Sequence, residues 1–115
     1  MSIRKSRAGR TIRFSLRGAI TLGYGSGSLR RSVAQALRAG ARRIEVDASG
    51  VRYLDAAGLG ELVACRAAAE KAGVEFVLCG AMGKARELLA ITGLDQALMR
   101  QPRDQSMHGL HWRVA

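Results

Sequence analysis

Apolar and polar side chains alternate along residues 11–20. Ile12, Phe14 and Leu16 are apolar, and the positions between them carry arginine or serine. A period of two places the apolar side chains on one face, which predicts a half-buried β-strand. A glycine then interrupts the pattern, and residues 20–22 predict a short second strand.

A helical period follows a glycine-rich stretch. Leu29, Val33 and Leu37 recur at the spacing of one helix face, with arginine and glutamine between them. Ser28 is placed to cap this helix at its N-terminus, and Gly40 is placed to end it.

Two further helices are predicted in the second half of the chain. Asp55 is placed to cap a helix that contains an alanine-rich run and ends at Gly73. The last helix begins near Met82, carries apolar residues on adjoining positions and closes at Gly93.

Three more segments predict strands. Residues 42–49 form the first, and a turn is expected at Ser49 and Gly50. Residues 74–80 are rich in β-branched and aromatic side chains, which favours a central buried strand. Residues 94–100 predict a last short strand.

The predicted order of elements is β-β-α-β-α-β-α-β. Strands that alternate with helices are typical of an α/β domain in which helices pack against a mixed or parallel sheet. At 115 residues the chain is long enough for one domain with a single core. We expect that domain at residues 11–100, with a basic N-terminal extension at residues 1–10 and a tail at residues 101–115.

Positive charge is concentrated at the front of the chain. The net charge is +10; residues 1–41 hold nine Arg or Lys and no acid, whereas residues 42–99 hold seven basic and eight acidic residues. A basic balance attracts nucleic acids or anionic membranes. However, two Phe, two Tyr and one Trp form no repeated basic–aromatic pattern for stacking bases. The composition therefore favours a solvated basic face over a dedicated nucleic-acid site.

Acids, histidines and nucleophilic side chains do not lie at the sequence spacing of a catalytic set, so we do not expect the chain to be an enzyme. Cys65 and Cys79 stand singly in apolar segments and predict buried free thiols in a reducing cytoplasm. His108 and His111 lack a third ligand, and we expect neither a metal nor another cofactor. The sequence shows neither a membrane span nor a signal peptide, so we expect a cytoplasmic protein.

Residues 54–62, LDAAGLGEL, place an acid, two small residues and Gly-Leu-Gly at a predicted helix start. With RRIEVDASGV and RYLDAAGLGELV, and with GVEFVLCG and LLAITGLDQAL further along, the chain resembles a STAS domain. This is the domain of bacterial anti-sigma factor antagonists and of the cytoplasmic ends of sulphate transporters. The resemblance covers residues 11–100 and implies the STAS fold, a small mixed β-sheet covered by helices.

The resemblance also implies a partner switch. In antagonists of this family the unphosphorylated domain binds an anti-sigma factor, usually a serine kinase, and so frees the sigma factor. The kinase phosphorylates a serine or threonine directly after the acid of the motif, which ends the binding, and a phosphatase resets it. On this sequence the phospho-acceptor position is Ala56, and the implied partner-binding residues are Asp55, Ala56, Ala57, Gly58, Leu59 and Gly60.

The residues of this motif also have ordinary structural roles. Asp55 is expected to cap the helix and organise the motif rather than to act as a catalytic carboxylate. Gly58 and Gly60 predict close packing of helix on sheet, a docking surface, or both.

Alanine at position 56 has no oxygen that could carry a phosphate. The chain is therefore a natural antagonist not switched at this site, an engineered nonphosphorylatable variant, or a STAS protein with another function. Ser49 and Thr92 offer other hydroxyls, for which capping or surface hydrogen bonding is the simpler role.

Three function classes follow. The favoured one is an anti-sigma factor antagonist whose partner is an anti-sigma factor, with a phosphatase as a further partner. The alternative is an adaptor that binds a transporter subunit in a membrane lipid transport complex. Nucleic-acid binding through residues 1–41 is less favoured.

Overall fold

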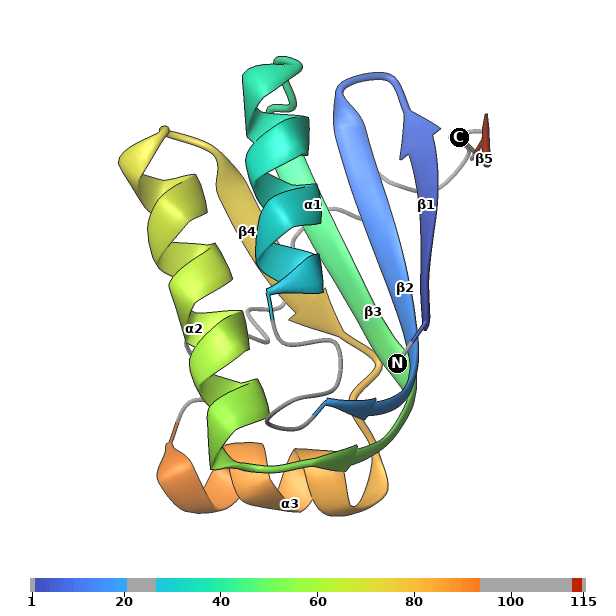
Figure 1. The fold of residues 1–115 in the computed structure, drawn as a ribbon, viewed down its shortest axis with the longest axis vertical. Coiled ribbons are helices and arrows are strands. Elements are labelled where there is room, and N and C mark those ends of the chain that lie inside the picture. Colours follow the sequence, from blue (N-terminus) through green and yellow to red (C-terminus); the bar gives the residue numbers. More distant parts are fainter. Residues whose placement is uncertain (1, 21–26, 94–112, 115) are drawn as a thin grey trace.

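One mixed β-sheet organises the chain, and two of its helices lie side by side on one face of that sheet (Figure 1). The computed structural model describes residues 2–20, 27–93 and 113–114. Its elements are β1 Ser2–Ala8, β2 Thr11–Ile20, α1 Ser28–Arg38, β3 Arg43–Leu54, α2 Ala56–Lys71, β4 Glu75–Cys79, α3 Gly83–Thr92 and β5 Arg113–Val114.

The strands lie in the order β4-β3-β2-β1-β5. β1 pairs antiparallel with β2 and with β5, whereas β2, β3 and β4 run parallel to one another. The parallel connections pass through α1 and α2, as parallel neighbours require a crossover. α3 lies across the lower end of the sheet in Figure 1 and packs against β3. The prediction of a small mixed sheet covered by helices is confirmed.

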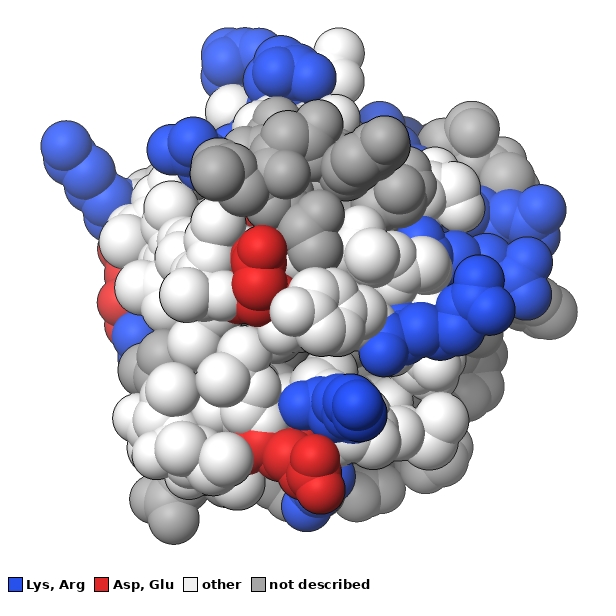
Figure 2. Space-filling model, turned by 60° about the horizontal axis from the view of Figure 1, so that its bottom comes forward, with Lys and Arg blue, Asp and Glu red and all other residues white. Residues whose placement is uncertain are grey.

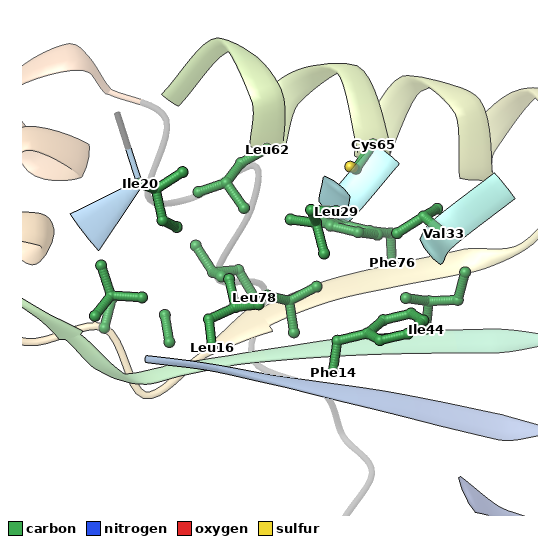
Figure 3. Close-up of a cluster of buried hydrophobic side chains, with 14 of the residues drawn as sticks. Phe14, Leu16, Ile20, Leu29, Val33, Ile44, Leu62, Cys65, Phe76 and Leu78 are labelled. Carbon is green, nitrogen blue, oxygen red and sulfur yellow. The ribbon is translucent and has the colours of Figure 1, made fainter. Parts of the chain in front are cut away.

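The core lies between the helix-bearing face of the sheet and the two helices on it. Figure 3 shows Phe14 and Ile44 on the strands facing Leu29 and Leu62 on the helices, and all four side chains are fully buried. The alternation predicted in residues 11–20 is confirmed, because Ile12, Phe14 and Leu16 are all buried.

The first strand of the sheet was missed. Residues 1–10 were expected to be an extension outside the domain, but Ser2–Ala8 form β1 and pair with the whole length from Thr11 to Arg17. The apolar residues of this strand are Ile3 and Ala8, which lie five positions apart and so show no period of two. Of the short strand predicted at residues 20–22, Ile20 is the last residue of β2 and residues 21–22 lie outside the described residues.

β3 is longer than the sequence indicated. The turn expected at Ser49 and Gly50 is wrong, because the strand continues for 12 residues to Leu54. Its pairing with β2 shifts register at this point, as in a β-bulge. A Cβ on Gly50 would lie 2.6 Å from the Leu16 carbonyl oxygen, so the bulge needs a glycine there.

The far strands also differ from the expectation. Phe76, Val77 and Leu78 in β4 are buried as predicted, but β4 ends the strand order of the described sheet and is not central. The strand predicted at residues 94–100 lies outside the described residues. Within the tail predicted at 101–115, residues 113–114 form β5.

Candidate functional site

The turn between β3 and α2 is fixed by Asp55. Its carboxylate accepts a hydrogen bond from the Gly58 backbone N–H at 2.8 Å, so the predicted N-cap of α2 is confirmed. Its own backbone N–H donates to the Ile20 carbonyl at 3.3 Å. The start of α2 is therefore held both by its own cap and by the end of β2.

The two glycines of the motif have different surroundings. A Cβ on Gly58 would lie 2.1 Å from the Ile20 carbonyl oxygen and 2.8 Å from Leu54 Cδ1. A Cβ on Gly60 would have no atom within 4 Å. Of the two roles left open for these glycines, Gly58 has the close packing, whereas Gly60 has open space around it and is exposed.

The motif is thus divided between the core and the surface. Gly58 and Leu59 are buried, whereas Ala56, Ala57 and Gly60 are exposed. An α-helix places residues three or four apart on one side, so the exposed side continues through Val63. We call the four exposed residues Ala56, Ala57, Gly60 and Val63 the motif face.

Further apolar side chains are exposed on the elements next to α2. Among the described residues, the exposed large hydrophobic side chains are those of Tyr53, Val63, Met82 and Ile91. They lie near the end of β3, on α2, at the N-cap of α3 and on α3 itself. Figure 2 shows the end of the molecule that carries α3, where uncharged side chains cover broad areas between a few charged ones. Uncharged surface with exposed apolar side chains is compatible with contact with another protein.

A buried acid on α2 holds the start of α1. Glu61 is only 5% exposed, and its Oε2 accepts backbone N–H groups of Gly27 at 2.7 Å and of Arg30 at 3.3 Å. Its Oε1 forms an ion pair with Arg30 Nε at 3.0 Å. A carboxylate at this place satisfies amides that the helix itself leaves open.

Glu61 explains why the cap predicted at Ser28 is wrong. Gly27 is the N-cap of α1 with φ 86°, and no side chain of its own caps the helix. The Ser28 hydroxyl instead accepts a hydrogen bond from Arg31. Glu61 was not among the predicted site residues, although an acid between the apolar residues of a helix is a signal for a buried polar contact. The other helix ends agree closely with the prediction, since Gly93 is the C-cap of α3 and Gly40 and Gly73 directly follow C-caps.

The two cysteines are free, and neither is activated. Burial and, to a smaller extent, the negative charge of Glu61 raise the pKa of the free Cys65 thiol to about 12. Burial also raises the pKa of Cys79 to about 11, with a smaller contribution from Glu45. Cys65 is buried as predicted, whereas Cys79 is partly exposed. Both thiols stay protonated near neutral pH and are poor nucleophiles.

Four charged side chains on the other face of the sheet, Arg13, Arg43, Glu45 and Glu75, form ion pairs with one another. Glu45 accepts Arg13 on one oxygen at 2.9 Å and Arg43 on the other at 3.2 Å. Arg43 also pairs with Glu75 at 2.7 Å. These contacts join β2, β3 and β4 and leave the buried Glu45 fully paired.

The remaining candidates show ordinary contacts. The Thr92 hydroxyl donates to carbonyls in the last turn of α3, and the Ser49 backbone N–H donates to Asp47. In the described part of the chain, no group of three or more metal-binding side chains comes together. His108 and His111 lie outside the described residues. None of the helices described is long and apolar enough to cross a membrane.

A mixed sheet with two helices on one face and an Asp-capped helix start at its end defines a STAS domain. The sequence matches the family described as "Mlab, STAS domain" over residues 3–101. The chain belongs to the STAS family. A search of curated proteins gives no matching sequence.

Solved structures with the same fold include anti-sigma factor antagonists. The chain matches SpoIIAA in its unphosphorylated form with 17% identity and a TM-score of 0.75, over 92% of this chain and 93% of that one. The phosphorylated form of SpoIIAA, from Bacillus, matches with a TM-score of 0.69 at 17% identity, over 92% and 96% of the two chains. An antagonist from Mycobacterium paratuberculosis matches with 20% identity and a TM-score of 0.72, over 92% and 90%.

A protein that is not an anti-sigma factor antagonist has the same fold. A sulfate transporter family protein from Wolinella succinogenes matches with 18% identity and a TM-score of 0.62, over 78% of this chain and 72% of that one. At these identities the likenesses show the shared fold.

Proposed function

We propose that this chain is a protein-binding module without catalytic activity, which acts as an anti-sigma factor antagonist in the cytoplasm. Its partner is an anti-sigma factor of the serine-kinase type, and it docks through the motif face at the start of α2. The observation that carries the proposal is the exposure of Ala56, Ala57 and Gly60 on a helix start that Asp55 and Gly58 hold in place.

Small uncharged residues suit such a contact because they let a partner backbone approach closely. The exposed side of α2 offers no charged group to desolvate across the motif face. Val63 within the motif face and Tyr53 near it at the end of β3 supply exposed apolar area. Interfaces are stabilised chiefly by a buried apolar centre of this kind.

Alanine at position 56 removes phosphorylation as a way to end the docking. A phosphate on the first residue of a helix lies near open backbone amides and adds nearly two negative charges. On the motif face these charges would oppose the docking of an apolar partner surface. Since alanine has no hydroxyl, this chain is not switched off there.

The other hydroxyls do not replace this site. Thr92 lies in the last turn of α3, where a phosphate would meet the negative end of the helix dipole. Ser49 lies on β3 at the bulge, away from the helix start.

The experiment begins with identification of the partner. The full chain is used to capture partners from an extract of its source cell, and the captured protein is then purified and titrated. Ala56→Asp is expected to weaken the affinity about tenfold or more, because it places a charge in an apolar contact. Ala67→Asp, two to three turns further along the exposed side of α2, is the matched control and is expected to bind more nearly like the parent.

A second variant tests the switch. Ala56→Ser is expected to bind like the parent until the partner kinase and ATP are added, and then to be phosphorylated and released. The parent is expected to remain bound under the same conditions. Equal binding by Ala56→Asp and the parent would contradict docking through this turn.

A second candidate function is an adaptor subunit of a membrane lipid transport complex. The fold shared with a sulfate transporter family protein supports it. The two candidates use the same surface and differ in the partner. Capture of a transporter ATPase instead of an anti-sigma factor would favour the adaptor.

A further inference from the structure

A polar hollow lies on the sheet where β1 begins and β2 ends. Its volume is about 760 Å³, and an adjoining hollow of about 800 Å³ shares Ser2, Arg17, Ser49 and Gly50 with it. We call the combined site the basic hollow. The residues that carry the argument are Ser2, Arg4, Ser15, Arg17, Ser49 and Arg52.

The strand register places these side chains on the face opposite the helices. Ser2 lies opposite Arg17, and Arg4 lies opposite Ser15. Directly opposed residues in an antiparallel pair point to the same face. The neighbouring Leu16 is buried on the helix-bearing side, so Ser15 and Arg17 point away from it.

The bulge in β3 completes the hollow. Arg17 lies opposite Gly50 rather than the residue that regular pairing would supply. Gly50 can take no side chain there because of the Leu16 carbonyl oxygen. Ser49 and Arg52, on either side of Gly50, are both exposed and line the hollow.

Within the described residues, the positive charge of the hollow exceeds its negative charge. Arg4, Arg17 and Arg52 are exposed, and no other residue in the described ranges forms an ion pair with them. Asp47 is the acid in the lining, and one of its oxygens accepts the Ser49 backbone N–H at 3.0 Å. The lining therefore carries three positive charges and one negative charge, and the aspartate already accepts a backbone hydrogen bond.

The same face shows the opposite arrangement deeper in the sheet. There Arg13 forms an ion pair with Glu45, and Arg43 forms ion pairs with Glu45 and Glu75. At the hollow, by contrast, exposed guanidinium groups have no ion-pair partner in the described part of the chain, and an anion could reach them from solvent.

We propose that the basic hollow binds a phosphate group. Guanidinium groups bind phosphate oxygens through pairs of charge-assisted hydrogen bonds, and serine hydroxyls add further donors. The group belongs either to a free phosphorylated molecule or to a lipid headgroup. This site lies on β1, β2 and β3 and does not rest on the proposed docking through α2.

The test uses two triple variants of the full chain with the same loss of charge. The first is Arg4→Gln with Arg17→Gln and Arg52→Gln. The control is Arg31→Gln with Arg38→Gln and Arg86→Gln, which removes exposed arginines of α1 and α3. Glutamine keeps much of the side-chain stem, and thermal unfolding checks that both variants fold.

Two probes separate the two sources of phosphate. Inorganic pyrophosphate is titrated in phosphate-free buffer while backbone amide chemical shifts are recorded. Vesicles of phosphatidylcholine with or without phosphatidylglycerol are tested by co-sedimentation. For the parent we expect saturable shifts around Arg4, Arg17 and Ser49. We expect affinity about tenfold or more weaker in the first triple variant and nearly unchanged affinity in the control.

Each outcome decides the proposal. Loss of pyrophosphate binding in the first variant but not in the control supports it, and binding to anionic vesicles with the same dependence identifies a lipid headgroup. Pyrophosphate binding without vesicle binding identifies a soluble phosphorylated ligand. Binding of neither probe, or equal weakening in both variants, would overturn it. Equal weakening in both variants would mean that the net charge alone attracts anions, including duplex DNA.

Discussion

The two sides of α2 carry small residues in opposite surroundings. On the buried side, Gly58 contacts the β2 carbonyl, Glu61 caps α1 and Cys65 lies in the core. On the exposed side, Ala56 faces solvent and Gly60 has open space around it. Gly58 and Gly60, two positions apart, are therefore restricted by different constraints: packing at Gly58, and at Gly60 only what a partner would contact.

This difference teaches that stability and binding can be altered separately. Substitutions on the buried side change the free energy of unfolding and leave the motif face chemically intact. Substitutions on the exposed side change what a partner meets and cost the fold little. The following predictions test this separation.

Gly58→Ala is expected to have the largest effect. Its methyl group would overlap the Ile20 carbonyl, and the backbone of α2 must move to relieve the contact. We expect the free energy of unfolding to fall by about 3 kcal/mol, measured by urea denaturation with an unchanged m-value. A stability equal to that of the parent would contradict the close approach of α2 to β2.

Glu61→Ala comes next. It leaves the backbone N–H groups of Gly27 and Arg30 without their acceptor and breaks the ion pair with Arg30. We expect a loss of about 2 kcal/mol and faster hydrogen exchange at the start of α1. The control Glu70→Ala removes an exposed pair with Arg66 and should cost about 0.5 kcal/mol or less.

Asp55→Ala removes the N-cap of α2. We expect a loss of about 1 kcal/mol in thermal or urea unfolding. Asp55→Asn keeps an oxygen that can accept the Gly58 N–H, so it should retain most of that stability. If both variants lose equally, the charge rather than the hydrogen bond stabilises this turn.

Gly60→Ala should act in the opposite direction to Gly58→Ala. An exposed alanine inside a helix is favoured over glycine, so we expect about 0.5–1 kcal/mol of added stability. On the proposed function, the same methyl group weakens partner binding, which a titration of the purified partner measures. A more stable variant with weaker binding would be the clearest separation of the two sides.

The smallest effect concerns Cys65. Its thiol has a pKa raised from 9.0 to about 12 by burial, so the unfolded chain ionises first as the pH rises. The native state then keeps a proton that the unfolded chain has released. The contribution of the neutral thiol to the free energy of unfolding is complete below about pH 8 and falls as the pH rises. Between about pH 8 and about pH 9 we expect the parent to lose about 0.4 kcal/mol more than Cys65→Ala. Parallel pH profiles would contradict this.

The features that the sequence predicted correctly depend on local chemistry. The alternation in β2, the Asp55 cap and the glycines that close the helices each act within a few residues. The features that it missed depend on distant partners. β1 is specified by pairing with β2, the continuation of β3 by a bulge against Leu16, and the cap of α1 by Glu61, which lies 34 residues from Gly27.

The cap of the motif was predicted, but the division of the motif between core and surface was not. The spacing of Asp55 and the two glycines located the motif, and the structure confirms the cap. That Gly58 is buried and Gly60 exposed follows from how α2 lies against the end of β2, which no pattern within the motif encodes.

The exposure of Ala56 has an evolutionary consequence. Every alanine codon becomes a serine codon by one change in its first base, and a hydroxyl at this surface position disturbs no packing. On the proposed function, a lineage could therefore gain or lose phosphorylation control by a single mutation that selection on folding would scarcely detect. Regulation at this position would then evolve on a much shorter timescale than the STAS fold that carries it.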